Sequence, residues 1–114
     1  MEILDLMRAC EFSPTHHVQK FLAESLHSSV SIACWEAGQI SPIHSHPAAD
    51  EIYYVLQGRG LFRDGRTEQH VGPGLTVYFR AGEAHQVECL TRMVLYRVHA
   101  GTDRQPKVLE GWPK

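Results

Sequence analysis

Apolar residues occur along the chain in short runs, which glycine, proline and polar residues separate. The strongest run is Glu51–Leu56, where isoleucine, tyrosine and valine concentrate. An Asp64-Gly65 pair between two further runs predicts a hairpin turn, and the glycines within 57–60 predict another turn. The pattern predicts strands over residues 18–23, 30–35, 51–56, 61–63, 67–71, 75–79, 85–90 and 93–98.

Helical signals are weak throughout, and only residues 3–9 offer a helical pattern. Many closely spaced strands with turn signals between them are typical of a β-sandwich or a small jelly-roll barrel, so we expect an all-β fold. Residues 1–15 form a segment that precedes the strands. The polar tail over 101–114 contains two prolines, and we expect it to lie on the surface or to fray.

Length and composition narrow the class of protein. The 114 residues are enough for a single domain, 1–114, and the formal net charge of −2 lacks the basic excess of a nucleic-acid binder. No apolar run approaches the roughly 20 residues that span a bilayer, so we expect no membrane partner. Cys10, Cys34 and Cys89 form no disulfide framework, which favours a reducing, cytoplasmic location.

Eight histidines stand out in this composition. His44 and His46 are two positions apart, so on a strand their side chains would share one face, about 7 Å apart. Glu51 opens the next strand signal, and His85 opens a later one. Because a jelly roll can bring such strands side by side, a site of three imidazoles and one carboxylate is geometrically reasonable.

Two segments carry a resemblance to a known family. Over residues 38–58, Gly38, His44, His46, Glu51 and Gly58 have the spacing of the first motif of the cupin superfamily. Residues 74–89 resemble its second motif, which contains His85. The resemblance implies a single conical cupin barrel in which one divalent metal ion is bound by His44, His46, Glu51 and His85.

The second motif departs from the family pattern at two positions. Arg80 stands where the family usually has proline, and Cys89 stands where it usually has asparagine. Neither position is a metal ligand in the family, so the departures concern the local turn and the lining of the pocket.

The expected donor set suits iron, manganese, nickel, copper, cobalt and zinc alike. A six-coordinate ion would keep two open positions, and three neutral imidazoles with one carboxylate leave it a net charge of +1. The resemblance implies a metal-dependent enzyme (a dioxygenase, isomerase, cyclase or lyase) acting on a small oxygen-rich or enolisable substrate. The alternative is a non-catalytic module that binds a small molecule or sugar, because the fold does not determine the function.

The alternation of side chains along strands gives a predicted pocket. If Glu51 and His85 point inward, Tyr53, Val55, Val87 and Cys89 do so as well. Trp35 is a further wall candidate, and Arg80 could neutralise an anionic substrate. His99 stays open between a pocket residue and a surface one, whereas His16, His17, His27 and His70 are expected on the surface.

We also expect a homodimer. The strands over 18–23 and 30–35 carry more apolar side chains than one face of a barrel needs, namely Val18, Phe21, Leu22, Val30 and Ile32.

Overall fold

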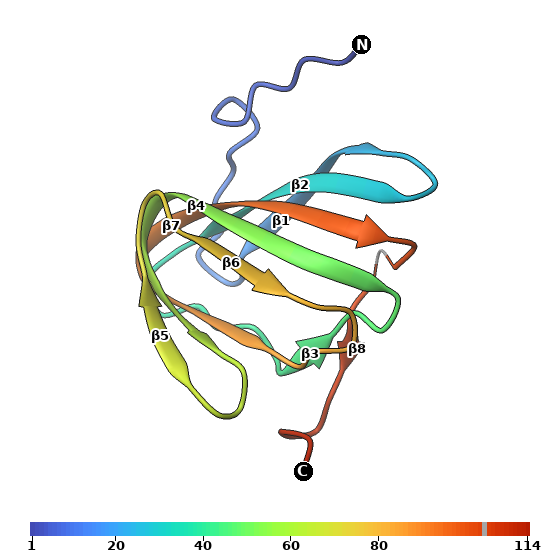
Figure 1. Cartoon of the computed structure of the whole chain (residues 1–114). Helices are drawn as coiled ribbons and strands as arrows, with labels where there is room; N and C mark the ends of the chain where they lie inside the picture. The colour runs from blue at the N-terminus through green and yellow to red at the C-terminus, as the bar shows by residue number, and fades with distance from the viewer. Residues whose placement is uncertain (104) are drawn as a thin grey trace.

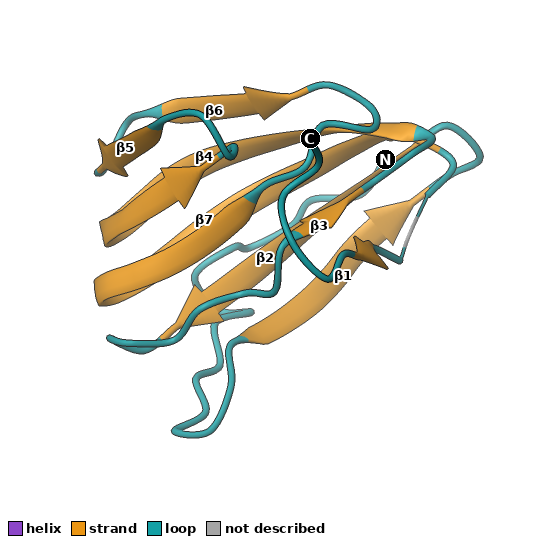
Figure 2. Ribbon diagram, turned by 90° about the horizontal axis from the view of Figure 1, so that it is seen from below, coloured by secondary structure: helices purple, strands orange, loops and turns teal. Residues whose placement is uncertain are grey.

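The computed structural model describes residues 1–103 and 105–114. All regular elements in these two ranges are strands, and no helix in them could span a bilayer. Figures 1 and 2 show the strands wrapped into a jelly-roll barrel, with the two chain ends on opposite sides of it. The strands are β1 (Val18–Glu24), β2 (Ser28–Trp35), β3 (His44–Ser45), β4 (Ala49–Arg63), β5 (Glu68–Val71), β6 (Thr76–Phe79), β7 (Gln86–Gly101) and β8 (Lys107–Val108).

The larger sheet has the order β1-β2-β7-β4-β5, with β6 also paired to β4, and all its pairs are antiparallel. The smaller sheet pairs β3 with β8. Residues 38–44 run antiparallel to the start of β7, with hydrogen bonds from Gly38 N to Cys89 O (2.9 Å) and from His44 N to His85 O (3.0 Å). This pairing brings the two halves of the barrel together beside the histidines.

Two predicted strand boundaries are wrong. The turn predicted at 57–60 lies inside β4, and the strands predicted over 85–90 and 93–98 are one strand, β7. The register of β4 against β7 shifts between Val55 and Gln57, between Gln57 and Arg59, and between Arg59 and Gly60. Such bulges bend a strand without ending its ladder, so the glycines here mark a bend in a continuous strand.

Residues 3–9 do not form the predicted helix. They contain a single turn, in which Ala9 N donates to Leu6 O at 3.2 Å. Tertiary packing decides the conformation here, because a helix this short gains little stability by itself. The segment covers the outer side of the larger sheet, where Leu6, Ala9, Cys10 and Phe12 pack against Ile32, Cys34 and Val94.

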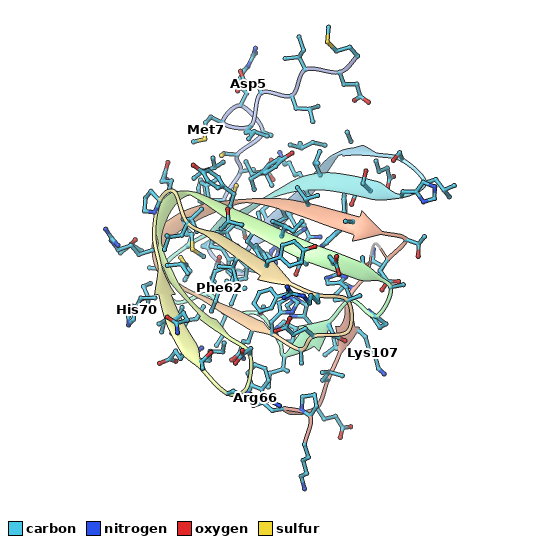
Figure 3. All side chains as sticks on the ribbon, viewed as in Figure 1. Asp5, Met7, Phe62, Arg66, His70 and Lys107 are labelled. Carbon is cyan, nitrogen blue, oxygen red and sulfur yellow. The ribbon has the colours of Figure 1, made fainter. Side chains whose placement is uncertain are left out.

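The main core fills the barrel interior between β2, β4 and β7. Its largest members include Trp35, Tyr53, Phe62 and Phe79, and Figure 3 places Phe62 inside the barrel. The C-terminal tail wraps across the surface, with Leu109 N donating to Ile43 O at 2.9 Å. The tail thus holds the segment that carries β3, and with it His44.

Candidate metal centre

The predicted ligands come together from three segments: residues 44–46, the start of β4, and residue 85 just before β7. His44 and His85 are bridged by backbone hydrogen bonds in both directions, at 3.0 and 2.8 Å, which puts their side chains next to each other. Glu51 lies on β4 between Phe79 of β6 and His99 of β7. His46 precedes β4, and its ring centroid lies 5.8 Å from that of His44.

The carboxylate of Glu51 lies at the middle of this cluster and is only 1% exposed. Its Oε1 lies 2.6 Å from His85 Nε2 and accepts a hydrogen bond from Tyr53 at 2.8 Å. Its Oε2 lies 3.4 Å from His46 Nε2 and also contacts His99 Nε2. Two overlapping groups could hold a metal ion, each with its ligand atoms within 4.8 Å of one another: His44, Glu51 and His85, and His46, Glu51 and His99.

His99 is the donor whose role the sequence left open, and its side chain is buried beside the four predicted ligands. It faces Glu51 directly across the β4–β7 ladder. The relevant signal in the sequence is its position two residues from Arg97, which gives both side chains the same face of one strand. Only the register between β4 and β7 decides that this face is the inner one.

The hydrogen bonds behind the imidazoles fit a metal ion. The carbonyl oxygens of Pro42 and Glu83 lie 2.8 and 2.9 Å from the Nδ1 atoms of His44 and His85. Because a carbonyl only accepts, Nδ1 carries the proton in both rings, and Nε2 of a neutral ring keeps its lone pair for a ligand. This arrangement, with Nδ1 bound to a carbonyl and Nε2 left for an ion, is typical of metal-ligating histidines.

Burial sets the charges of the site. Desolvation lowers the pKa of His44 to about 4, so this imidazole is neutral at pH 7. Burial alone would raise the pKa of Glu51, but the contacts of its carboxylate with His46, His85 and His99 outweigh it and hold the pKa well below its usual range. Desolvation raises the pKa of Tyr53 well above its usual value. Glu51 therefore remains a carboxylate, with a neutral phenol as donor.

A cavity of about 110 Å³ opens beside the cluster. Of the predicted pocket residues, Trp35, Tyr53 and Val87 line it. The full lining consists of His17, Gln19, Trp35, Ser41, Pro42, His44, His46, Tyr53, Val87, Arg97 and Pro106.

Three other predicted pocket residues lie outside this lining. Val55 and Cys89 point inward as expected, but they pack in the apolar core, farther along β4 and β7. Desolvation raises the pKa of the Cys89 thiol to about 11, so it is no ready nucleophile. Arg80 is exposed at the turn after β6, and its guanidinium lies 5.4 Å from the ring centroid of Tyr78.

Two residues of the cavity wall were not expected there. His17 was predicted on the surface, but it is half-buried and stacks on Trp35 with 3.9 Å between ring centroids. A residue just before the first strand carries no periodic signal that would have shown this. Arg97 has the same parity as His99 on β7, and it is buried on the inner face. His16, His27 and His70 are exposed as expected.

The fold is a jelly-roll barrel, and its buried donor cluster could hold a metal ion. The family model described as "Cupin domain" matches residues 31–99, which is more than half of the chain and includes both motifs. The chain therefore belongs to the cupin family, as the motif spacing predicted.

Three similar proteins illustrate the relationship. The chain is 29% identical over 75 residues to an uncharacterized protein of Methanocaldococcus jannaschii. The aligned segment covers 62% of this chain and 60% of that protein. It is 35% identical over 46 residues to an oxalate-binding protein of Thermotoga maritima. Here the aligned segment covers 40% of this chain and 38% of that protein. The crystal structure of TT1209 from Thermus thermophilus superposes with a TM-score of 0.84 at 28% identity, covering 90% of this chain and 100% of that one.

Proposed function

We propose that this cupin domain binds one divalent metal ion per chain through His44, His46, Glu51 and His85, and that it uses the ion to act on a small oxygen-rich or enolisable molecule. The observation that carries the proposal is the convergence of these buried donors on one carboxylate at the edge of a cavity. A bound divalent ion would act as a Lewis acid that polarises oxygen atoms of the substrate.

The residues around the donors prepare the site for this chemistry. Tyr53 donates to Glu51 at 2.8 Å and holds the carboxylate in one orientation. Val87 and the indole of Trp35 give the cavity an apolar wall, which strengthens electrostatic interactions with a substrate. Desolvation lowers the pKa of His17 to about 4, so its neutral ring can accept a hydrogen bond from a substrate hydroxyl.

The second candidate is a binding module without catalysis, which takes up the same kind of molecule. The small cavity and the similarity to a protein named as oxalate-binding favour it. About 110 Å³ is well below the roughly 300 Å³ at which pockets for drug-sized ligands begin. Both candidates require the same metal centre, and turnover separates them.

Metal reconstitution followed by a substrate panel tests the proposal. Stripped protein incubated with each divalent ion should take up close to one ion per chain by elemental mass spectrometry. At a hundredfold excess over Kd, the ion should raise the free energy of unfolding by about 2.7 kcal/mol, and a chelator should reverse this gain.

The loaded protein is then given enols, keto acids and hydroxy acids, with product formation and oxygen uptake as readouts. Turnover supports the enzyme, and saturable binding without turnover supports the binding module. His70→Ala, which removes an exposed imidazole, should leave metal uptake unchanged. A protein that takes up no ion contradicts both candidates.

We also propose that the chain forms a homodimer in the cytoplasm. The N-terminal segment already covers Ile32, but Phe21 on β1 and Leu26 beyond it remain 38% and 74% exposed. Paired chains could bury these side chains in an isologous contact. The three cysteines are all free thiols, which agrees with a reducing compartment. Light scattering at micromolar concentration should give twice the mass of the chain, and a monomer mass would contradict the dimer.

A further inference from the structure

Two of the three cysteines lie side by side on the outer side of the larger sheet. Cys34 is 1% exposed on β2, and Cys10 belongs to the N-terminal segment that packs over it. The Cys34 thiol interacts with the Cys10 thiol and with the backbone N–H of Glu11. Figure 3 shows Asp5 and Met7 of the same segment outside the barrel. Two neighbouring thiols are the starting point for a disulfide, in which the sulfur atoms are about 2 Å apart.

The backbone around Cys10 is free to bring the two sulfur atoms together. The N-terminal segment contains a single turn, and side-chain contacts hold it to the barrel, such as the ring of Phe12 beneath the guanidinium of Arg92 at 3.9 Å. Cys34, in contrast, lies on a strand that is paired with β1 on one side and β7 on the other. A disulfide would therefore move Cys10 and leave the position of Cys34 unchanged.

The N-terminal segment leads from Cys10 to the mouth of the cavity. The carbonyl oxygen of Ser13 accepts a hydrogen bond from the Gln39 side chain at 2.8 Å. Farther along, His17 stacks on Trp35 with 3.9 Å between ring centroids, and both residues line the cavity. A covalent link at Cys10 fixes one end of this connection, while β1 fixes the other end. The link would thus restrict the motion of the chain beside the cavity mouth.

The different exposure of the two thiols determines which one reacts first. Burial raises the pKa of Cys34 to about 11, so this thiol stays protonated at pH 7. Cys10 is only partly buried, and its Sγ lies 3.7 Å from the carbonyl oxygen of Leu6. An oxidant in the solvent therefore reaches Cys10 first, and Cys34 is the resolving thiol beside it.

We propose that Cys10 and Cys34 form a redox-sensitive pair, which a hydroperoxide converts into a disulfide that links the N-terminal segment to β2. With hydrogen peroxide, the Cys10 sulfur attacks one oxygen, the O–O bond breaks, and a sulfenic acid forms as one water molecule leaves. The Cys34 sulfur then attacks the Cys10 sulfur, the S–O bond breaks, and the Cys34 proton leaves in a second water molecule. The two thiols lose two electrons and two protons, the peroxide is reduced to water, and a thiol reductant reverses the change. No step involves a metal ion.

Mild treatment of the whole chain with hydrogen peroxide tests the pair. At low micromolar protein concentration, peptide mass spectrometry should find Cys10 linked to Cys34, with a loss of about 2 Da for the two hydrogens. After unfolding, alkylation should label three thiols in the reduced chain and only Cys89 in the oxidised chain. Cys89 is the internal control, because it packs in the barrel interior, in a different cluster from the other two cysteines.

Amide hydrogen exchange and thermal unfolding measure the consequence of the link. The disulfide should slow exchange over residues 6–17 at least about fivefold, because it suppresses local opening of the segment. It should also raise the melting temperature by at least about 5 °C, because it closes a loop of the unfolded chain. Exchange over β5, on the other side of the barrel sheet, should not change.

Cysteine variants separate the pair from other effects of peroxide. Cys10→Ser removes a partly buried thiol and should abolish both responses to peroxide. Cys89→Ala, the matched control, removes a thiol outside the pair and should keep both responses. If Cys89→Ala fails to fold, the unmodified Cys89 of the oxidised parent chain serves as the control, as described above.

Each contrary result overturns the proposal at a defined point. If Cys10 ends as a sulfinic acid while Cys34 is still alkylated, the two sulfur atoms do not meet, and the pair is wrong. Disulfides between two chains through Cys10 overturn the link within one chain. A Cys10–Cys34 disulfide with unchanged exchange over residues 6–17 overturns the effect on the N-terminal segment. Three alkylated thiols after peroxide treatment overturn the redox sensitivity itself.

Discussion

Replacing Glu51 with glutamine is expected to abolish stoichiometric metal binding and to lower the free energy of unfolding by about 3 kcal/mol. Glu51 is the only buried carboxylate among the described residues, and it accepts from Tyr53 while contacting His85 at 2.6 Å. A glutamine keeps the shape but only one acceptor oxygen, and its NH₂ group cannot accept where the other oxygen stood. One oxygen of Glu51 faces Tyr53 and His85, and the other faces His46 and His99. It also leaves the buried charge of Arg97 without a carboxylate beside it.

Elemental analysis of reconstituted protein and urea unfolding of the metal-free protein measure the two effects separately. Glu88→Gln is the matched control: Glu88 pairs with Arg63 at 2.8 Å, but both side chains are partly exposed. Such pairs contribute less than about 1 kcal/mol, and this one lies outside the donor cluster. Full metal occupancy in Glu51→Gln would remove Glu51 from the ligand set.

The sequence is most informative where donors are close along the chain. The spacing of His44, His46 and Glu51 is local, and His85 keeps its place in the second motif, so their gathering was predictable. His99 and Arg97 enter the site through the β4–β7 register, which pairs residues more than forty positions apart. No local pattern encodes that register. The register nevertheless decides the position of both side chains, because a shift of one residue would turn them outward.

The pocket prediction shows the same limit. Alternation correctly gave an inward direction for Val55 and Cys89, but alternation does not tell how far along the barrel axis a residue lies. Both residues are inside, at the depth of the apolar core. The prediction for Arg80 rests on its charge, which could neutralise an anionic substrate in the pocket. The turn after β6 carries Arg80 to the surface instead. The direction of these side chains was predictable from sequence. Their position along the barrel axis depends on the bends in β4 and β7, which the sequence does not show.

Gly58 is expected to be the most sensitive backbone position, with Gly58→Ala losing at least about 4 kcal/mol of stability or failing to fold. Gly58 lies at the bulge of β4 and has φ of +82°. A Cβ built there would be 2.0 Å from the carbonyl oxygen of Arg92 and 2.7 Å from the Cα of Met93. Both are backbone atoms of β7, so the clash of the added Cβ is removed only if β4 and β7, the two longest strands of the barrel, move apart.

Gly38→Ala is the control that separates the effect of the steric contact from the effect of the positive-φ backbone conformation. Gly38 belongs to the same motif and has φ of +90°, but a Cβ there meets no atom within 4 Å. The left-handed conformation alone costs an L-residue roughly 1–2 kcal/mol, so Gly38→Ala should fold and unfold at moderately lower urea. Urea midpoints within experimental error of each other for the two variants would show that the contact with β7 at Gly58 adds nothing to the loss of stability. A soluble, folded Gly38→Ala beside an insoluble Gly58→Ala is the expected result, because only Gly58 lies against the backbone of the neighbouring strand.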